Sequence, residues 1–534
     1  MAADDHKQHE GDAHAHPSIF EGFNLVKSIF SVALLTFSIS LILGLIFTEQ
    51  TTVSEKVHPA VAFIILLISV VWLANIEGSQ GAIVGLAPIN NELYRESHPW
   101  AYRISQMCHK GDNLDRYLLG RQFSVVLIVF AIHNCAAPIK GADLWNLPTI
   151  VQQLFLGAGL SEIFFTVMVG QLSAEVNASL CMLDYINDPF SYFTAIASLA
   201  LEFSGIIHFS YAIRYIFCYL ASTKVESKEP PRSAVQQLFF WGRVTFSFAC
   251  LVYAFAVTLI ALFNGETTLW EGIPPGAGLA LFFVLMAIVG LFESTQIAYF
   301  AVAKLRQNER GTSIWAKKSC DLLYAGKDGQ AGVNLPGFMI GRQLFVVSCM
   351  FFVAKVTSCN VQPGEPTIMG VSEGVQAFFN TGLLGALITT IIGSIAWRLA
   401  AATFPIFFLS ILPSYIGLRV CLALNACGLL NGAWVLGWLH KKLAGFQEDE
   451  VYIGTAEERA GNNMADDESQ LGLGAGHPII LPGFAAQAPP SLKKLLQEDP
   501  AVAQYMSSLH ESFQGKEAGI HDTDNSDCED PATK

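Results

Sequence analysis

The chain has 534 residues, of which 52% are hydrophobic and only 14% are charged, and its mean hydropathy is +0.42. A soluble protein of this length would need many more charged side chains to cover its surface. The formal net charge of −14 lies mostly in two polar tails, and the absence of a basic stripe argues against a nucleic-acid partner. The composition therefore indicates a membrane-embedded protein.

The chain begins with 22 polar residues that include His6, His9, His14 and His16. Because no further metal ligands follow these histidines, the segment is predicted to be a disordered, solvated tail rather than a metal site. The first apolar run, 25–47, is too long for the hydrophobic region of a signal peptide and follows an acidic leader. It therefore predicts a transmembrane helix that is retained.

Apolar runs of this kind recur along most of the chain and predict an all-α polytopic membrane protein. The eleven cysteines show no CxxC spacing and lie mostly within these runs, which is typical of small core residues. The predicted helices span approximately 25–47, 59–86, 118–136, 149–186, 190–221, 238–263, 275–303, 336–357, 371–411 and 413–440.

After Lys441 and Lys442 the chain becomes acidic and rich in Gly and Pro, which predicts a soluble cytosolic tail. Its one amphipathic stretch, 492–513, contains Pro500 and has too few heptads for a coiled coil. The predicted organisation is a tail at 1–22, a first repeat at 23–222, a linker at 223–237, a second repeat at 238–440 and a tail at 441–534.

The strongest pattern in the sequence is an internal repeat, which indicates two homologous halves. The offset between matching residues grows slightly along the chain, as small insertions would produce. The matching segments are 27–35 with 243–251 at an offset of 216, 113–122 with 334–343 at 221, 153–170 with 376–393 at 223, and Pro189 with Pro413 at 224.

Ten helices give five in each half, and an odd number inverts the second half, as in many secondary transporters. The loops 88–117 and 304–335 disagree with inversion, because they hold four and six Lys or Arg and the positive-inside rule places both in the cytosol. A parallel arrangement of six plus six spans would remove the conflict by counting 173–188 and 396–411 separately, although 173–188 is short and polar. We predict five plus five inverted spans, with six plus six as the alternative.

Two duplicated motifs place polar residues within or at the start of apolar helices: Glu-x-x-Gln at 77–80 and 293–296, and Gly-Arg-Gln at 120–122 and 341–343. Glu and Gln three residues apart share one helix face, and an Arg at the start of a helix can pair with the Glu. One buried Glu–Arg pair could simply lock two helices together, whereas two symmetric copies with added Gln favour a binding site. The candidate substrate-binding residues are Glu77, Gln80, Arg121, Gln122, Glu293, Gln296, Arg342 and Gln343.

The glycines of the first motif, Gly78 and Gly81, are predicted either to break the helix or to allow a close backbone approach. The two Glu and two Arg of the duplicated motifs cancel in charge, while their side chains and the amides offer both donors and acceptors. An anionic cargo would need an excess of Arg, and a lone cation would need carboxylates and carbonyls without Arg. The motifs therefore favour a small, neutral, hydroxyl-rich solute.

Further acidic residues occur in the fourth and fifth predicted helices of the first half. Glu162, Glu175 and Asp184 are candidate ligands of a coupling ion, and capping acids at a helix end are the structural alternative. The chain contains no HExxH, GxSxG, P-loop or GxGxxG motif, so no enzymatic activity and no metal or organic cofactor is predicted.

The order of EGxQ, GRQ and CMLD, followed by second copies of the first two, resembles the diatom silicic-acid transporter family over about 25–440. This resemblance implies sodium-coupled uptake of orthosilicic acid, ten transmembrane helices, cytosolic termini, and a substrate site formed by the eight residues of the duplicated motifs. The second motif departs from the family pattern, because Ser294 replaces the Gly. The family's coiled-coil tail also has little support in this sequence.

The predicted function is sodium-coupled symport of orthosilicic acid by alternating access in the plasma membrane, with an intracellular vesicle membrane as the alternative location. A passive channel for small neutral hydroxylated solutes and a silicic-acid sensor without transport remain open as other functions. The implied partners are orthosilicic acid, sodium and the lipid bilayer, together with a homo-oligomer or a protein bound through the tail.

Overall fold

A computed structural model of the chain describes residues 19–87, 89–139, 141–220, 227–270, 272–303, 313–324, 334–362 and 364–454. The described residues form helices and no β-strand, with isolated bridges at Thr51–Pro138 and Thr267–Cys359. The predicted all-α architecture is confirmed.

The first half contains α1 (Ile19–Phe47), α2 (Pro59–Gly85), η1 (Asn91–Tyr94), α3 (Pro99–Cys108), α4 (Asn113–Ala136), α5 (Thr149–Val151), η2 (Gln152–Gly157), α6 (Leu160–Val167), η3 (Met168–Leu172), α7 (Ser173–Leu180), α8 (Met182–Ile186), α9 (Pro189–Phe203) and α10 (Phe209–Leu220). The second half and the chain after it contain α11 (Ala234–Asn264), α12 (Pro275–Ala303), α13 (Ile314–Tyr324), α14 (Leu335–Thr357), η5 (Ile368–Gly370), α15 (Glu373–Phe379), α16 (Leu383–Ile388), η6 (Thr389–Ile395), α17 (Ala396–Thr403), α18 (Pro405–Leu409), α19 (Leu412–Cys427), α20 (Gly432–Ala444) and α21 (Glu450–Ile453).

Eight helical stretches of the described chain are long and apolar enough to cross a membrane, four in each half. The last predicted helix of each half is instead a broken pair. α9 and α10 have only 15 and 12 residues, and α19 and α20 bend by 68° at their break. If the α19–α20 pair counts as a span, the number rises to nine.

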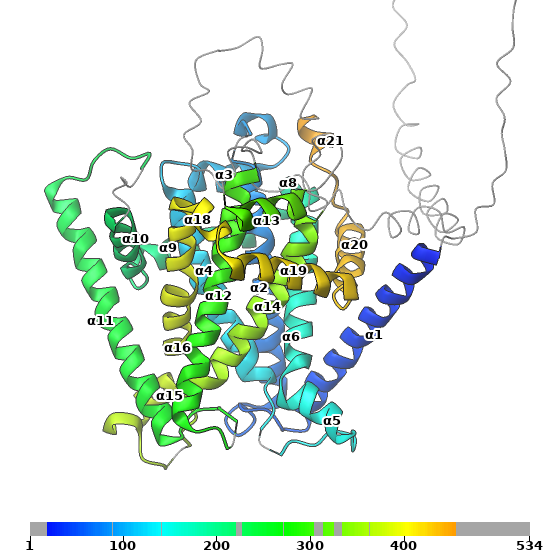
Figure 1. Cartoon of the computed structure of the whole chain (residues 1–534), viewed down its shortest axis with the longest axis vertical. Coiled ribbons are helices and arrows are strands. Elements are labelled where there is room, and N and C mark those ends of the chain that lie inside the picture. Colours follow the sequence, from blue (N-terminus) through cyan, green and yellow to red (C-terminus); the bar gives the residue numbers. More distant parts are fainter. Residues whose placement is uncertain are drawn as a thin grey trace, which may run out of the picture. The chain divides into compact units, whose positions relative to one another are not determined.

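The two halves run in the same direction. In Figure 1, α3 and α13, which follow the second span of each half, lie at one end of the helical bundle, whereas α5 and α15 lie at the other end. Within each half the packing is equivalent, because α3 packs on α4, α8 and α9 as α13 packs on α14, α18 and α19. The inverted arrangement that we predicted from five spans per half is therefore not the observed one. Hydropathy alone cannot distinguish a broken pair from a crossing helix.

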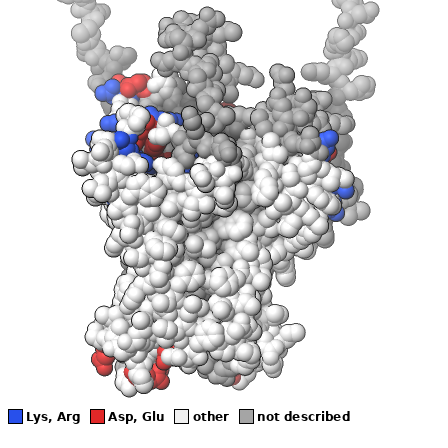
Figure 2. Space-filling view, turned by 60° about the vertical axis from the view of Figure 1, so that its left-hand side comes forward, with Lys and Arg blue, Asp and Glu red and all other residues white. Residues whose placement is uncertain are grey.

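Parallel halves also remove the conflict with the positive-inside rule. The helices that these loops contain, α3 and α13, lie at the same end, as the Lys and Arg content of the loop sequences requires. On the face shown in Figure 2, Lys and Arg gather near this end, the opposite end shows only Asp and Glu, and an uncharged band separates them. The alternative with six plus six spans had the right orientation but too many crossings.

The long fourth helix of each half is interrupted at equivalent places. Gly159 and Gly382, which are 223 residues apart, both adopt the left-handed conformation, with φ of 76° and 77°. Cys181 and Phe404, also 223 apart, share nearly identical backbone angles at the next break. The internal repeat of the sequence is thus reproduced in local backbone geometry.

The broken pair of each half is held by the first helix of the other half. In α1, Lys27 donates to the carbonyl of Ala426 (2.6 Å) and Ser31 to that of Leu429 (2.6 Å), both at the break between α19 and α20. The repeat-equivalent residues of α11 do the same at the break between α9 and α10. Arg243 donates to the carbonyl of Phe203 (3.1 Å), and Ser247 donates to that of Ile206 (2.7 Å). The two halves are therefore interlocked.

Candidate functional site

A cavity of about 90 Å³ lies between the two halves and is lined by α2, α4, η3 and α7 from the first half and by α12, α14 and α17 from the second. One water molecule needs about 10–15 Å³ on this measure, so the cavity can hold a small solute. All eight candidate substrate-binding residues line it: Glu77, Gln80, Arg121, Gln122, Glu293, Gln296, Arg342 and Gln343.

The first-half wall is organised around the buried carboxylate of Glu77. Arg121 of α4 donates a hydrogen bond from one guanidinium nitrogen to the carboxylate of Glu77 and a second one, from the other nitrogen, to the side-chain oxygen of Gln122 (3.0 Å). The amide nitrogen of Gln171, from η3, donates to the other oxygen of Glu77 (3.1 Å). Arg121 and Glu77 are 1% and 5% exposed, so the pair is shielded from bulk water.

The second-half wall repeats this arrangement and adds a second arginine. Arg342 donates to Glu293 (2.9 Å) and to the side-chain oxygen of Gln343 (2.5 Å), as Arg121 does in the first half. Arg398 of α17 also donates to Glu293, through its Nε (2.6 Å). One carboxylate therefore serves two guanidinium groups on this wall.

Close helix contacts at glycines set the positions of these motifs. A Cβ at Gly120 or Gly341 would overlap the backbone of Ser198 or Cys421, so α4 touches α9 as closely as α14 touches α19. Gly78 lies against the ring of Tyr185, and α2 continues without a break through this motif. Of the two roles predicted for the glycines, Gly78 has the close approach.

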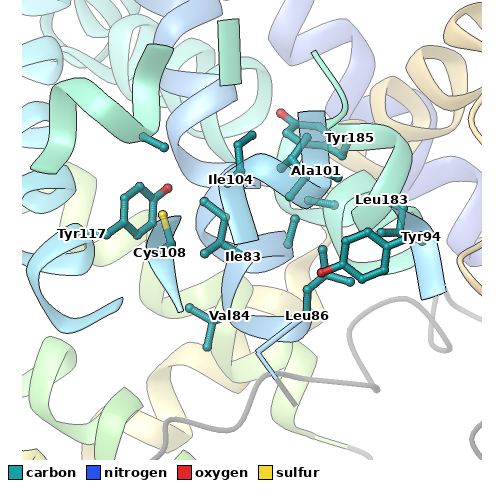
Figure 3. Close-up of a cluster of buried hydrophobic side chains, with 14 of the residues drawn as sticks. Ile83, Val84, Leu86, Tyr94, Ala101, Ile104, Cys108, Tyr117, Leu183 and Tyr185 are labelled. Carbon is teal, nitrogen blue, oxygen red and sulfur yellow. The ribbon is translucent and has the colours of Figure 1, made fainter. Parts of the chain in front are cut away.

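Buried apolar side chains fix the end of α2 that carries the first motif. Ile83 and Val84 pack with side chains of α3, α4 and α8, including Ile104, Tyr117 and Tyr185 (Figure 3). The hydroxyl of Tyr185 also donates to the carbonyl of Ala74 (2.9 Å), one turn before Glu77. The position of Glu77 and Gln80 therefore depends on this cluster.

The cavity contains two charged residues beyond the duplicated motifs, Glu175 and Arg398. They are 223 residues apart, so they occupy the same position of the repeat with opposite charge. The charged lining is thus three Glu and three Arg, and the cavity remains balanced overall, as the sequence suggested. Arg398 was missed, although the repeat offset applied to Glu175 would have identified it.

Of the three candidate coupling-ion residues, only Glu175 lines the cavity. Glu162 is 1% exposed and pairs with the Nδ1 of His133 (2.8 Å), away from the lining residues. The structure does not bring Glu162 and Asp184 together with Glu175.

Asp184 instead holds the chain that follows the last helix. Its carboxylate accepts from the backbone N–H of Gln447 (2.6 Å) and lies 3.2 Å from the Nε2 of His98. Asp449 completes the contact in the reverse direction by accepting from the backbone N–H of Leu183 (2.8 Å). Burial, together with the charge of Asp184, raises the pKa of Tyr452, which also contacts Asp184. The acid of the CMLD segment therefore has a structural partner.

No group of three or more His, Cys, Asp or Glu side chains among the described residues is arranged to hold a metal ion, and the N-terminal histidines lie outside those residues. What the cavity offers is a set of carboxylate oxygens, guanidinium donors and amides around a small space. Such a lining can hydrogen-bond a polar solute from both halves.

Comparison with known proteins adds one finding. A family model described as a silicon transporter matches residues 19–530 of the chain. No curated protein and no solved structure matches it. The matched segment contains every described helix and both copies of the Glu-x-x-Gln and Gly-Arg-Gln motifs, so it covers both walls of the cavity.

Proposed function

This chain belongs to the silicon transporter family, and from that premise we propose that it is a symporter that moves orthosilicic acid across a membrane together with sodium. The cavity between the two halves is the cargo site, and the halves give it alternating access to the two sides. In transporters built from repeats, parallel ones included, substrate sites lie near the membrane midplane at the interface of the repeats.

The observation that carries the proposal is the convergence of the duplicated motifs on one cavity. Orthosilicic acid, Si(OH)4, is a neutral molecule whose four hydroxyl groups each donate and accept hydrogen bonds. Glu77 and Glu293 supply acceptors, and Gln80 and Gln296 supply amides that do both, from opposite walls. A tetrahedral set of hydroxyls can use both walls at once, which suits a site shared between two halves.

Within each wall, the role of the arginine is to position the acceptors. Arg121 is shared by Glu77 and Gln122, and Arg342 by Glu293 and Gln343. The guanidinium groups hold these side chains in fixed orientations and offset the carboxylate charges. A neutral cargo then meets a preorganised set of dipoles and no excess charge.

The orientation follows from the distribution of basic residues. We place the end with α3 and α13 in the cytosol, because the loop sequences that contain these helices hold four and six Lys or Arg. With the eight single-helix spans as the crossings, both ends of the described chain then lie on the cytosolic side. We place the protein in the plasma membrane, where uptake would occur.

Uptake of silicic acid into proteoliposomes tests the proposal. Purified protein is reconstituted, and accumulation is measured with an inward sodium gradient and with an equal potassium gradient. We expect accumulation above the external concentration with sodium only. Uptake that is equal in both salts and stops at equilibrium would establish a passive channel. Binding of silicic acid without uptake would establish a sensor. Either result would contradict symport.

A further inference from the structure

We propose that Glu175 is the residue that binds the coupling cation, so that sodium and cargo occupy one cavity, with the cation on the first-half wall. This inference rests on the proposed symport and adds the residue at which the coupling ion binds. Three observations support it: the free carboxylate, the oxygen atoms beside it, and the opposite charge at the equivalent place in the second half.

The carboxylate of Glu175 is available in a site where every arginine is engaged. Arg121 is held by Glu77, and both Arg342 and Arg398 are held by Glu293. Among the described residues, no hydrogen bond or ion pair to the carboxylate of Glu175 occurs, although the residue lines the cavity. A carboxylate within a membrane segment is costly unless it acquires a counter-charge, and a bound cation supplies one.

Neighbouring side chains offer further oxygen ligands on the same helix face. Gln171, Glu175 and Ser179 follow one another at intervals of four residues, and all three line the cavity. Gln171 is 1% exposed, and its side-chain oxygen has no partner among the described residues, because only its nitrogen is used, by Glu77. Carboxylate, amide and hydroxyl oxygens are the ligands that hard cations prefer.

The charge pattern of the two walls places the cation on the first half. Glu175 adds one negative charge to a wall where Glu77 and Arg121 cancel. Arg398 adds one positive charge to the opposite wall, where Glu293 already serves Arg342. A cation is therefore attracted to one wall and repelled from the other, while the total remains balanced.

A second carboxylate of the same span, that of Glu162, provides a control. Glu162 lies in the same membrane span, α6 to α7, but pairs with His133 outside the cavity lining. Exchanging either residue for Gln removes one carboxylate from the same span with little change of shape, Glu162 being buried and Glu175 partly buried. Only the exchange of Glu175 should alter the response to sodium.

Two measurements on wild type, Glu175→Gln and Glu162→Gln test the assignment. The first is the ratio of silicic-acid uptake in sodium to uptake in potassium, in proteoliposomes. The second is the rise in unfolding temperature of the purified protein when sodium chloride replaces potassium chloride, which reports ion binding without transport. We expect both responses in wild type and in Glu162→Gln. In Glu175→Gln we expect the uptake ratio to fall at least tenfold, towards one, and the temperature shift to vanish.

Sodium responses in Glu175→Gln equal to those of wild type would overturn the assignment while leaving symport intact. A wild type indifferent to sodium in both measurements would overturn symport, and this inference with it. If Glu175→Gln does not fold, Glu175→Asp decides, because a shortened carboxylate should shift half-maximal activation to a higher sodium concentration. An unchanged activation curve would contradict the proposal.

Discussion

The two walls of the cavity share one pattern and differ at a few positions. Both have a Glu on the second span, an Arg on the third that holds it, and a Gln beside that Arg. They differ in the fourth span. At equivalent positions of the repeat, the first half has Glu175 and Gln171, whereas the second half has Arg398 and Ser394. We infer that the residues shared by the two walls bind the cargo. The residues that differ make the two walls unequal in charge and provide the site for the ion.

The largest expected effect comes from removing the carboxylate of the second half. Glu293→Gln leaves two guanidinium groups without a carboxylate, the buried one of Arg342 and the partly buried one of Arg398, whereas Glu77→Gln leaves one. Removing one partner of a buried pair costs about 3–5 kcal/mol, so Glu293→Gln should destabilise the protein by at least that amount and more than Glu77→Gln. Unfolding in detergent, followed by circular dichroism, measures both. Equal losses would show that Arg398 does not depend on Glu293.

For the arginines, the larger loss of stability is expected in the first half. Arg121→Ala leaves Glu77 with only the amide of Gln171, whereas Arg342→Ala leaves Glu293 paired with Arg398. We expect Arg121→Ala to cost about 3–5 kcal/mol and Arg342→Ala less than half of that. The same unfolding assay compares them. The double variant Arg342→Ala with Arg398→Ala should lose as much stability as Arg121→Ala. A larger loss for Arg342→Ala alone would contradict the observed pairing.

A smaller difference in stability between the two halves is expected at the second residue of the Glu-x-x-Gln motifs. A Cβ at Gly78 would overlap the ring of Tyr185, so Gly78→Ala should cost about 1–3 kcal/mol through overpacking. The equivalent residue, Ser294, already has a Cβ and loses only its bond to the carbonyl of Leu291 when changed to Ala. That variant should lie within about 1 kcal/mol of wild type. Thermal unfolding checks both, and a neutral Gly78→Ala would show that Tyr185 can move away.

The smallest effect concerns an ion pair that only the first half has. Arg116 lowers the pKa of Glu229, through hydrogen bonds at 2.6 and 2.7 Å, whereas Gly337 occupies the equivalent of Arg116. A lowered folded-state pKa stabilises the protein above the ordinary value of 4.5, and this is lost as the pH falls through the lowered pKa. Glu229→Gln should therefore cost less than about 1 kcal/mol at pH 7 and nothing in acid. A pH-independent difference would contradict this.

The sequence predicted eight residues that line the cavity, because duplication marks positions that both halves need. It predicted spans well where one helix crosses, as in α2 and α12, which begin and end within one residue of the predicted bounds. It failed where apolar helices break, because the breaks at 204–208 and 428–431 contain no Pro and no Asp, Glu, Lys or Arg that would mark them. Because each broken pair was counted as one crossing, each half was given five spans, an odd number. The prediction of an inverted second half followed from that count and was wrong.

The role of single acidic residues was harder to predict. Glu175, Glu162 and Asp184 are equally unusual in an apolar sequence, yet one lines the cavity, one pairs with His133 and one holds the segment after α20. The partners of Glu162 and Asp184 come from 29 to 268 residues away, so local spacing holds no information about them. α3 and α13 were missed for a related reason, since short amphipathic helices in polar loops lack the length of a span.

The central claim is that one cavity, shared equally by two parallel halves, holds the cargo. Gln80 and Gln296 test it most directly, because they line the cavity from opposite walls and are not part of its ion pairs. We would measure sodium-driven silicic-acid uptake in proteoliposomes for Gln80→Ala and Gln296→Ala, with unfolding temperature as the control for folding. The account predicts that each variant loses at least tenfold in uptake while its unfolding temperature stays near that of wild type. Wild-type uptake in either variant would contradict a site shared between the halves.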